Sequence, residues 1–224
     1  AMLLFLSEHG LPHSFAPKLQ QAYGEKSFEI IQKNPYRLIN DISGIGFKTA
    51  DQLAHHLGLQ HDHPHRIDSG ILHIMDTLVG HTCYPLDTLI SSTAALLELP
   101  RTTNAIAERI DALVEQHVLY RLTLQQHPMI WQRTLAMAEW GISNELRRIQ
   151  QTHVQAPLST IIENLAALEH RVGLTLDPTQ KQAICQAVTQ PLHVITGGPG
   201  TGKSTLTRMI TGLFYNQKSI LLLA

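Results

Sequence analysis

Cysteines and long apolar runs are both scarce in this sequence. Two cysteines, Cys83 and Cys185, occur among 224 residues, far apart and outside any metal-ligand spacing. This excludes a disulfide framework, and we expect two ordinary buried thiols. No apolar run approaches the ~20 residues of a membrane span, and the first residues lack the basic flank and cleavage site of a signal peptide. Because a hydrophobic content of 43% is enough to form a core, we expect a globular, cytoplasmic protein.

Negative charge is missing from the last part of the chain. The formal net charge of the whole sequence is -1, so the chain is no polycation and any contact with nucleic acid must come from local patches. Residues 178–224 contain no carboxylate, although Lys181, Lys203, Arg208 and Lys218 lie there. This segment can attract anions, but it supplies no acidic ligand of its own.

The motif with the clearest chemistry is VITGGPGTGKST at residues 194–205. It fits the phosphate-loop pattern G-x-x-x-x-G-K-[ST]. The alternative is a glycine-rich turn that binds no ligand and matches all four positions by chance. Such a loop turns backbone N–H groups and a helix N-terminus toward a triphosphate. We predict an ATP site in which Lys203 contacts the outer phosphates in a catalytic role and Ser204 binds Mg²⁺. The predicted nucleotide-binding residues of the loop are Gly197, Gly198, Pro199, Gly200, Thr201, Gly202, Lys203, Ser204 and Thr205.

Two apolar runs flank this loop and its helix. Leu192–Ile195 precede the loop, a helix is expected over Ser204–Leu213, and Ile220–Leu223 follow. Continuously apolar runs of this length predict strands buried on both faces of a parallel sheet. We therefore expect the first βαβ unit of a RecA-like phosphate-loop domain.

A complete motor is not expected from these residues. No carboxylate follows Ser204, although a phosphate-loop enzyme takes acidic magnesium ligands from later strands. From this, and from the end of the chain at Ala224, we expect a fragment cut inside its motor domain and without ATPase activity. Because a two-stranded sheet is marginal by itself, we expect it to dock against the helical part or to pair with a second copy as a dimer.

A second motif lies within residues 34–59. Its centre, ISGIGFKTA at residues 42–50, has the apolar-x-Gly-apolar-Gly form of a helix-hairpin-helix. Two glycines make a hairpin tight enough to present free N–H groups at a helix start, where a DNA phosphate can dock without base contacts. The alternative is a tight turn between two packed helices. The predicted DNA-binding residues are Gly44, Ile45, Gly46, Lys48 and Thr49.

Histidines gather just after this motif. They are His55, His56, His61, His63 and His65. Such a cluster raises the alternative of a metal site. The last three alternate in a polar, proline-broken segment with no partner cysteine, which favours a solvated linker. We place the first domain boundary in this segment.

Three helical patterns and a β-hairpin pattern come next. The helices are expected from Arg66, over Asp87–Glu98 and over Thr103–Gln116. Alternating apolar residues over Val118–Leu124 and a return at Met129–Trp131 then predict two strands. This order is typical of a winged helix, which contacts duplex DNA in some proteins and packs against protein in others. Both alternatives stay open here.

The segment before the phosphate loop is helical. Patterns over Gln132–Thr152 and Ser159–Val172 predict connector helices, and DPTQ at residues 177–180 opens a further helix. In that tetrapeptide an aspartate suits the N-cap, proline the first helical position, and Gln180 the partner in a capping box. A carboxamide can also pair with the edge of adenine. The residues leave both interpretations of Gln180 open.

These patterns predict a mainly α multidomain fold. Its expected parts are a helix-hairpin-helix DNA-binding region at residues 1–62, a winged-helix-like domain at 63–131, connector helices at 132–175 and the start of a RecA-like ATP-binding motor domain at 176–224. The segments NPYRLINDISGIGFKTAD, GHTCYP, LDPTQKQAI and VITGGPGTGKST together resemble the RecD/TraA-type DNA helicases of superfamily one, and the resemblance covers essentially the whole chain.

The resemblance implies ATP-driven movement from 5′ to 3′ on single-stranded DNA. It also implies that Gln180 reads adenine, that Lys203 binds the outer phosphates and that Ser204 ligates magnesium. The acidic magnesium motif, the arginine sensor and the second motor domain of the family are absent from these residues, so its activity is not expected of this chain alone. The alternatives are a DNA-repair adaptor with a regulatory nucleotide site, and a phosphate-loop kinase, for which the sequence shows no lid region or acceptor site.

Overall fold

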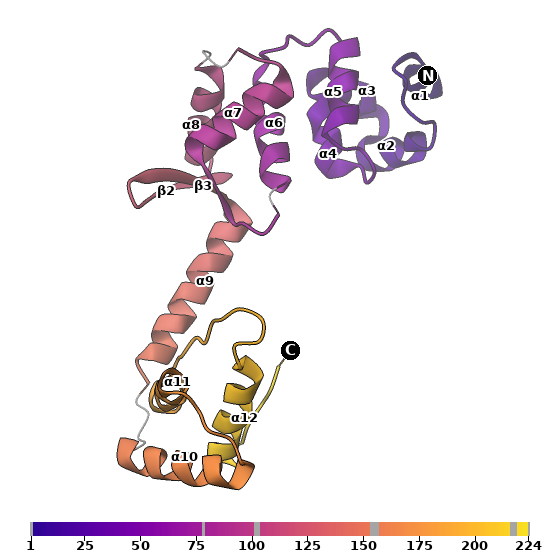
Figure 1. The fold of residues 1–224 in the computed structure, drawn as a ribbon. Helices are drawn as coiled ribbons and strands as arrows, with labels where there is room; N and C mark the ends of the chain where they lie inside the picture. Colours follow the sequence, from indigo (N-terminus) through magenta and orange to yellow (C-terminus); the bar gives the residue numbers. More distant parts are fainter. Residues whose placement is uncertain (1, 78, 101–103, 153–156, 216–218, 224) are drawn as a thin grey trace. The chain divides into compact units, whose positions relative to one another are not determined.

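The computed structural model describes residues 2–77, 79–100, 104–152, 157–215 and 219–223 (Figure 1). Helices account for most of these residues and one small sheet for the rest of the regular structure, so the predicted mainly α fold is confirmed. The chain divides into two compact units, residues 1–138 and 139–224. None of the described helices is long and apolar enough to cross a membrane. The four predicted domain ranges stay predictions.

Short helices surround the predicted hairpin in the first unit. In chain order they are α1 Met2–Glu8, α2 Phe15–Tyr23, the 3-10 helix η1 Gly24–Lys26, α3 Ser27–Lys33, the 3-10 helix η2 Pro35–Arg37, α4 Leu38–Asp41 and α5 Phe47–His56. Asn34 starts η2, because its side chain accepts a hydrogen bond from the Tyr36 N–H at 3.1 Å. The hairpin lies between α4 and α5.

Three helices and a three-stranded sheet complete the first unit. They are α6 Pro64–Asp76, β1 Cys83–Pro85, α7 Leu86–Leu97, α8 Ala105–Glu115, β2 Leu119–Leu124 and β3 His127–Gln132. The central strand β3 pairs antiparallel with both others, so that Trp131 lies opposite Cys83 on one side and Tyr120 on the other. The predicted helices and hairpin are present, whereas β1 was missed because three residues are too few to show a pattern. Thr103, the predicted start of α8, lies outside the described residues.

One continuous core runs through this unit. It joins Leu6 of α1 to Ile71 of α6 and Ile130 of β3, all fully buried. Arg109 of α8 also makes a two-point ion pair with Asp68 of α6, at 2.7 and 2.6 Å. The hairpin helices and the winged-helix-like elements therefore share one core.

Within its described residues, the second unit has three helices of its own. They are α10 Leu158–Val172, α11 Pro178–Thr189 and α12 Lys203–Phe214, and the long helix α9, Arg133–Gln150, leads into the unit from β3. A small core lies among α10, α11 and α12. Its buried members are Leu165, Leu168, Leu176, Ile184, Leu206 and Met209.

The two strands predicted beside the phosphate loop are not formed. No strand is assigned anywhere within 139–152, 157–215 or 219–223. In the first run Val194 is 74% exposed while Leu192 and Ile195 are half-buried, and residues 220–223 are all exposed, Leu221 by 80%. An isolated extended segment has no ladder partner for its backbone groups, so apolar sequence alone does not make it a strand. The predicted βαβ unit is thus wrong for this structure, although its helix is observed as α12.

Candidate nucleotide and DNA-backbone sites

Glycine is required at several points of the phosphate loop. Gly200 and Gly202 have φ angles of 78° and 84°, in the left-handed region that other residues rarely adopt. At Gly197 a Cβ atom would lie 2.5 Å from the Thr201 hydroxyl oxygen. That hydroxyl donates a hydrogen bond to the Gly198 carbonyl at 2.9 Å, which closes the loop on itself. The local chain therefore forms the tight loop that the motif predicts.

Lys203 reaches back over this loop. It is the first residue of α12, and its ammonium donates hydrogen bonds to the carbonyl oxygens of Gly197 and Gly198, both at 2.6 Å. The side chain is exposed, so these bonds hold the ammonium at the mouth of the loop rather than in a core. An ammonium has three donors and can exchange carbonyl oxygens for phosphate oxygens at little cost. The position fits its predicted contact with the outer phosphates.

Ser204 and Thr205 lie in the first turn of α12. Gly202 caps this turn without a side chain, so the first backbone N–H groups of the helix keep their donors for a ligand. The Ser204 side chain is exposed beside them. The described residues include no group of three His, Cys, Asp or Glu side chains that could hold a metal ion. The predicted role of Ser204 as a magnesium ligand stays a prediction.

Gln180 connects the start of α11 to the phosphate loop. Its carboxamide oxygen accepts the Asp177 N–H at 3.2 Å, while the Asp177 carboxylate accepts the Gln180 N–H at 2.9 Å, which completes the predicted capping box. The other end of the same side chain, Nε2, lies 3.0 Å from the point where a Cβ atom on Gly202 would be. Gln180 thus has its structural role and also lies close to the loop. Adenine recognition stays a prediction.

Two carboxylates fix α11 in place. Glu169 of α10 pairs with Lys181 at 2.9 Å and accepts the Leu176 N–H at 2.7 Å, and these two contacts lower its pKa. Hydrogen bonds from Thr179 and from the Gln180 N–H similarly lower the pKa of Asp177. Lys181 is thus engaged in an ion pair with Glu169, whereas the Lys203 ammonium bonds to carbonyl oxygens of the loop.

The hairpin between α4 and α5 places its residues unequally. Gly44 has a φ angle of 100°, so glycine is needed there, whereas Gly46 is extended, with φ -99° and ψ 178°, and caps α5 without any side chain. Gly44, Gly46 and Lys48 are exposed, and Thr49 is half-buried. Ile45 is only 4% exposed, and its N–H already bonds to the Ile42 carbonyl at 3.1 Å. Ile45 therefore anchors the hairpin, and the exposed residues are the ones available to a phosphate.

Lys18 was missed in the sequence. It lies on α2, and its ammonium donates to the Ser43 carbonyl of the hairpin at 2.7 Å. No local pattern joins these residues, because they are 25 positions apart and only the packing of α2 against the hairpin brings them together.

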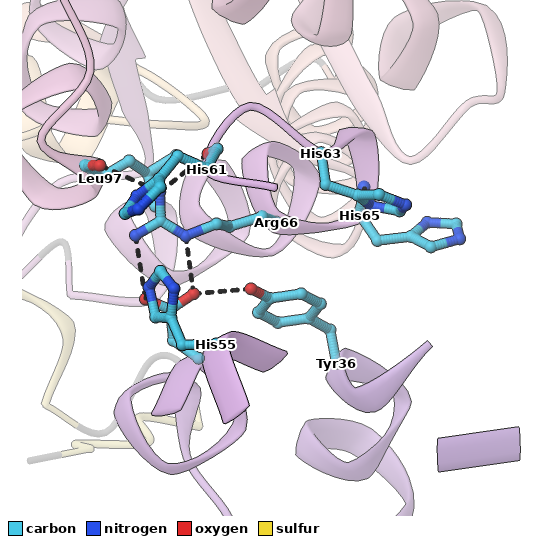
Figure 2. A network of polar contacts seen from close by, with 8 residues as sticks. Tyr36, His55, His61, His63, His65, Arg66 and Leu97 are labelled. Atoms are coloured by element: carbon cyan, nitrogen blue, oxygen red, sulfur yellow. Dashed lines mark hydrogen bonds and ion pairs between the residues drawn. The ribbon is translucent and has the colours of Figure 1, made fainter. Parts of the chain in front are cut away.

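Arg66 joins the hairpin helix to the rest of the first unit (Figure 2). The residue is 4% exposed, and its guanidinium makes two bonds to the Asp51 carboxylate, from Nε at 2.9 Å and from Nη2 at 3.0 Å. Nη1 donates to the carbonyls of His61 at 2.9 Å and Leu97 at 3.0 Å. One side chain thereby ties together α5, the histidine segment, the start of α6 and the end of α7.

Tyr36 completes this network. Its hydroxyl donates to the Asp51 carboxylate at 2.6 Å. Burial alone would raise the pKa of Asp51, but the hydrogen bonds from Arg66 and Tyr36 lower it below the ordinary value, and burial together with the bond to Asp51 raises the pKa of Tyr36. The sequence had indicated Arg66 only as the start of a helix.

The histidines have structural positions around this network. His55 lies 3.5 Å from Asp51 and its ring lies 4.8 Å from that of His61, centre to centre. His63 caps α6, because its Nδ1 accepts the His65 N–H at 3.2 Å. Burial lowers the pKa of His65. The described part of this cluster thus supports α5 and α6 and holds no three-ligand arrangement for a metal.

The hairpin region and the phosphate-loop region of this chain each match a known protein family. Residues 1–83 match the family described as the ATP-dependent RecD2 DNA helicase HHH domain, and residues 180–224 match the family described as AAA domain. The chain is also 26% identical over 232 residues to the ATP-dependent RecD2 DNA helicase of Deinococcus radiodurans. These matches confirm the predicted resemblance to the RecD-type helicases. It covers 30% of the length of that relative, which in turn matches 95% of this chain.

Proposed function

We propose that this chain is the DNA-backbone- and ATP-binding part of a DNA helicase that moves 5′ to 3′ and acts in DNA repair and recombination. The observation that carries the proposal is the phosphate loop, in which Lys203 lies over the carbonyls of Gly197 and Gly198 at the start of α12. The hairpin before α5 supplies the second half of the proposal. Similarity to a RecD2 helicase supports this combination in one protein.

At the nucleotide site each residue has a separate proposed role. Backbone N–H groups of residues 197–205 bind the phosphates, Lys203 neutralises the outer ones, and Ser204 shares a magnesium ion with them. Gln180, which lies at the start of α11 close to Gly202, recognises adenine. Because residues 178–224 contain no carboxylate, the chain by itself binds ATP without turning it over.

Nucleotide binding is tested by titrating a fluorescent ATP analogue with magnesium against the chain. Lys203→Ala should weaken binding at least tenfold, whereas Arg208→Ala, which removes an exposed cation from the same helix, should not change it. Equal affinity of wild type and Lys203→Ala would overturn the nucleotide site. DNA-stimulated phosphate release by the wild type, well above that of Lys203→Ala, would overturn the absence of turnover.

At the hairpin, DNA is held by its backbone alone. The exposed donors belong to Gly44, Gly46 and the first turn of α5, beside the Lys48 ammonium. Such contacts carry no base information, so binding should be weak, independent of sequence and steeply dependent on salt. Replacing Gly44 and Gly46 by valine should weaken binding to all sequences alike in fluorescence anisotropy. Unchanged affinity of that double variant would show that the hairpin is not the contact.

A second copy of the chain is the proposed partner of the exposed apolar segments. Val194 and Leu221 through Leu223 are all more than half exposed, and solvent-exposed apolar residues of this kind favour association. Light scattering should give a mass above that of one chain, and Leu221→Ser with Leu223→Ser should lower it. A single-chain mass for the wild type at high concentration would exclude the pairing.

A further inference from the structure

We infer that Lys18, on α2, is a second cation of the hairpin's DNA site and contacts the same phosphate backbone as Lys48. The inference rests on the proposed DNA contact of the hairpin and extends it to a helix outside the motif. Lys18 is exposed, yet its ammonium is fixed at 2.7 Å from the Ser43 carbonyl, one residue before Gly44.

The position of Lys18 is set by contacts on two sides. Its ammonium lies 5.5 Å from the centre of the Phe15 ring, one turn earlier on α2. Atoms of the same ring lie 3.5 Å, and the Lys18 ammonium 3.9 Å, from where a Cβ atom on Gly44 would be. The α2 face formed by Phe15 and Lys18 therefore packs against the turn of the hairpin. A lysine held in this way loses less side-chain freedom when it meets a phosphate.

The hydrogen bond to Ser43 does not use up the ammonium. It takes one of the three donors and leaves two for phosphate oxygens. Among the described residues, no ion pair includes Lys18 or Lys48, so both charges are available. A carbonyl partner orients the cation without cancelling its charge, whereas a carboxylate partner would cancel it.

The nearest carboxylate in the sequence has two partners of its own. Asp41, at the end of α4, accepts a hydrogen bond from the Tyr23 hydroxyl at 2.6 Å and lies 3.7 Å from the Arg37 guanidinium. Tyr23 is the last residue of α2, so this helix contributes at both of its ends. Lys18 brings a positive charge to the hairpin, and Tyr23 donates a hydrogen bond to the carboxylate nearby. The result is a surface that favours a polyanion.

The experiment measures duplex DNA affinity against salt concentration for wild type, Lys18→Gln and Lys18→Arg. Loss of one phosphate contact should make the negative slope of log K against log salt less steep by about 0.9. At 0.1 M salt this corresponds to about eightfold weaker binding. Lys18→Arg should restore both values, because the charge returns. Lys26→Gln, which removes an exposed lysine of η1, is the matched control and should leave the slope unchanged.

A purely structural role for Lys18 would give a different result. If Lys18 only held the hairpin through Ser43, Lys18→Gln would weaken binding with an unchanged slope and would speed hydrogen exchange at residues 42–47, and this outcome would overturn the inference. Lys48→Gln is the reference for the proposed function. If Lys48→Gln lowers the slope and Lys18→Gln does not, only the inference about Lys18 fails. If neither changes binding, the proposed DNA contact of the hairpin fails as well.

Discussion

The two units of the chain use their apolar residues in different ways. In the first unit one core extends from α1 to the sheet, and a buried ion pair of Arg66 and a half-buried one of Arg109 connect its helices. In the second unit three helices enclose a small core, while Val194 and residues 220–223 remain exposed. The apolar residues beside the phosphate loop are thus only partly covered, whereas those of the first unit form an extended core.

This difference distinguishes structure that is set by neighbouring residues from structure that depends on packing between distant segments. The phosphate loop forms because its glycines, Thr201 and Lys203 bond within a few residues of each other. A buried parallel strand, in contrast, depends on neighbours that are distant in sequence. The phosphate loop can therefore take its shape from local bonds, although the unit around it has little long-range packing.

Removing Arg66 should have the largest effect on stability. Arg66→Ala leaves the Asp51 carboxylate without its main partner and opens two carbonyl hydrogen bonds, which should cost the first unit about 3–5 kcal/mol of unfolding free energy. The matched control is Arg148→Ala on α9, where the pair with Glu145 is exposed and should contribute less than about 1 kcal/mol. Urea unfolding measures both variants, and hydrogen exchange of α5 and α6 reports the loss at Arg66. Similar small losses for the two variants would show that the buried network does not hold the unit together.

Adding a methyl group at helical glycines should give the next largest effect. A Cβ atom on Gly70 would lie 2.9 to 3.1 Å from three atoms of fully buried Leu97, so Gly70→Ala should cost about 1–3 kcal/mol. Gly141 of α9 has no atom within 4 Å of that position, so Gly141→Ala should instead stabilise by about 0.5–1 kcal/mol.

The second unit offers a direct comparison for this substitution. At Gly212 the nearest atom, on Leu168, is 3.0 Å away, the next atoms lie at 3.4 and 3.8 Å, and the core there has fewer buried residues. Gly212→Ala should therefore cost less than Gly70→Ala in the same thermal or urea unfolding measurements. A larger cost at Gly212 would reverse the comparison between the units.

The sequence predicts most of the local structure. The helix starts at Asp177 and at the phosphate loop, the hairpin of β2 and β3, and the need for glycine at Gly44 could all be derived from spacing and residue type. Each of these depends on bonds or dihedral angles within a few residues. The prediction for Gly46 was less accurate, since its extended backbone does not require glycine.

Long-range contacts could not be derived in this way. Lys18 meets the hairpin across 25 positions, and Arg66 meets Leu97 across 31. Neither pair leaves a periodic signal, because each depends on how helices pack. The prediction of strands at 192–195 and 220–223 was wrong for a different reason. The local pattern of a buried strand is present there, but among the described residues no strand lies beside these segments.

Acid should weaken the first unit through Asp51. The pKa of Asp51 is lower in the folded protein than the ordinary value of about 3.9, so its contribution is complete above that pH and is lost as pH falls through the folded pKa. Below about pH 4, wild type should therefore lose stability faster than Asp51→Asn, whose side chain does not titrate in this range. Urea unfolding at steps between pH 6 and pH 3 measures the difference, with both proteins in the same buffers. Parallel curves for the two proteins would show that the ion pair with Arg66 adds no acid dependence.

The smallest effect is expected where the apolar pattern and the structure disagree. Val194 is 74% exposed, so Val194→Ser should change the unfolding free energy of the second unit by less than about 0.5 kcal/mol in dilute solution. Ile184 of α11 is fully buried in the same unit, and Ile184→Ser should cost about 3 kcal/mol or more, because it removes apolar contacts and buries a hydroxyl. Thermal unfolding at low protein concentration compares the two variants without self-association. If Val194→Ser cost as much as Ile184→Ser, the segment before the phosphate loop would be packed in solution, and the contrast between the two units would disappear.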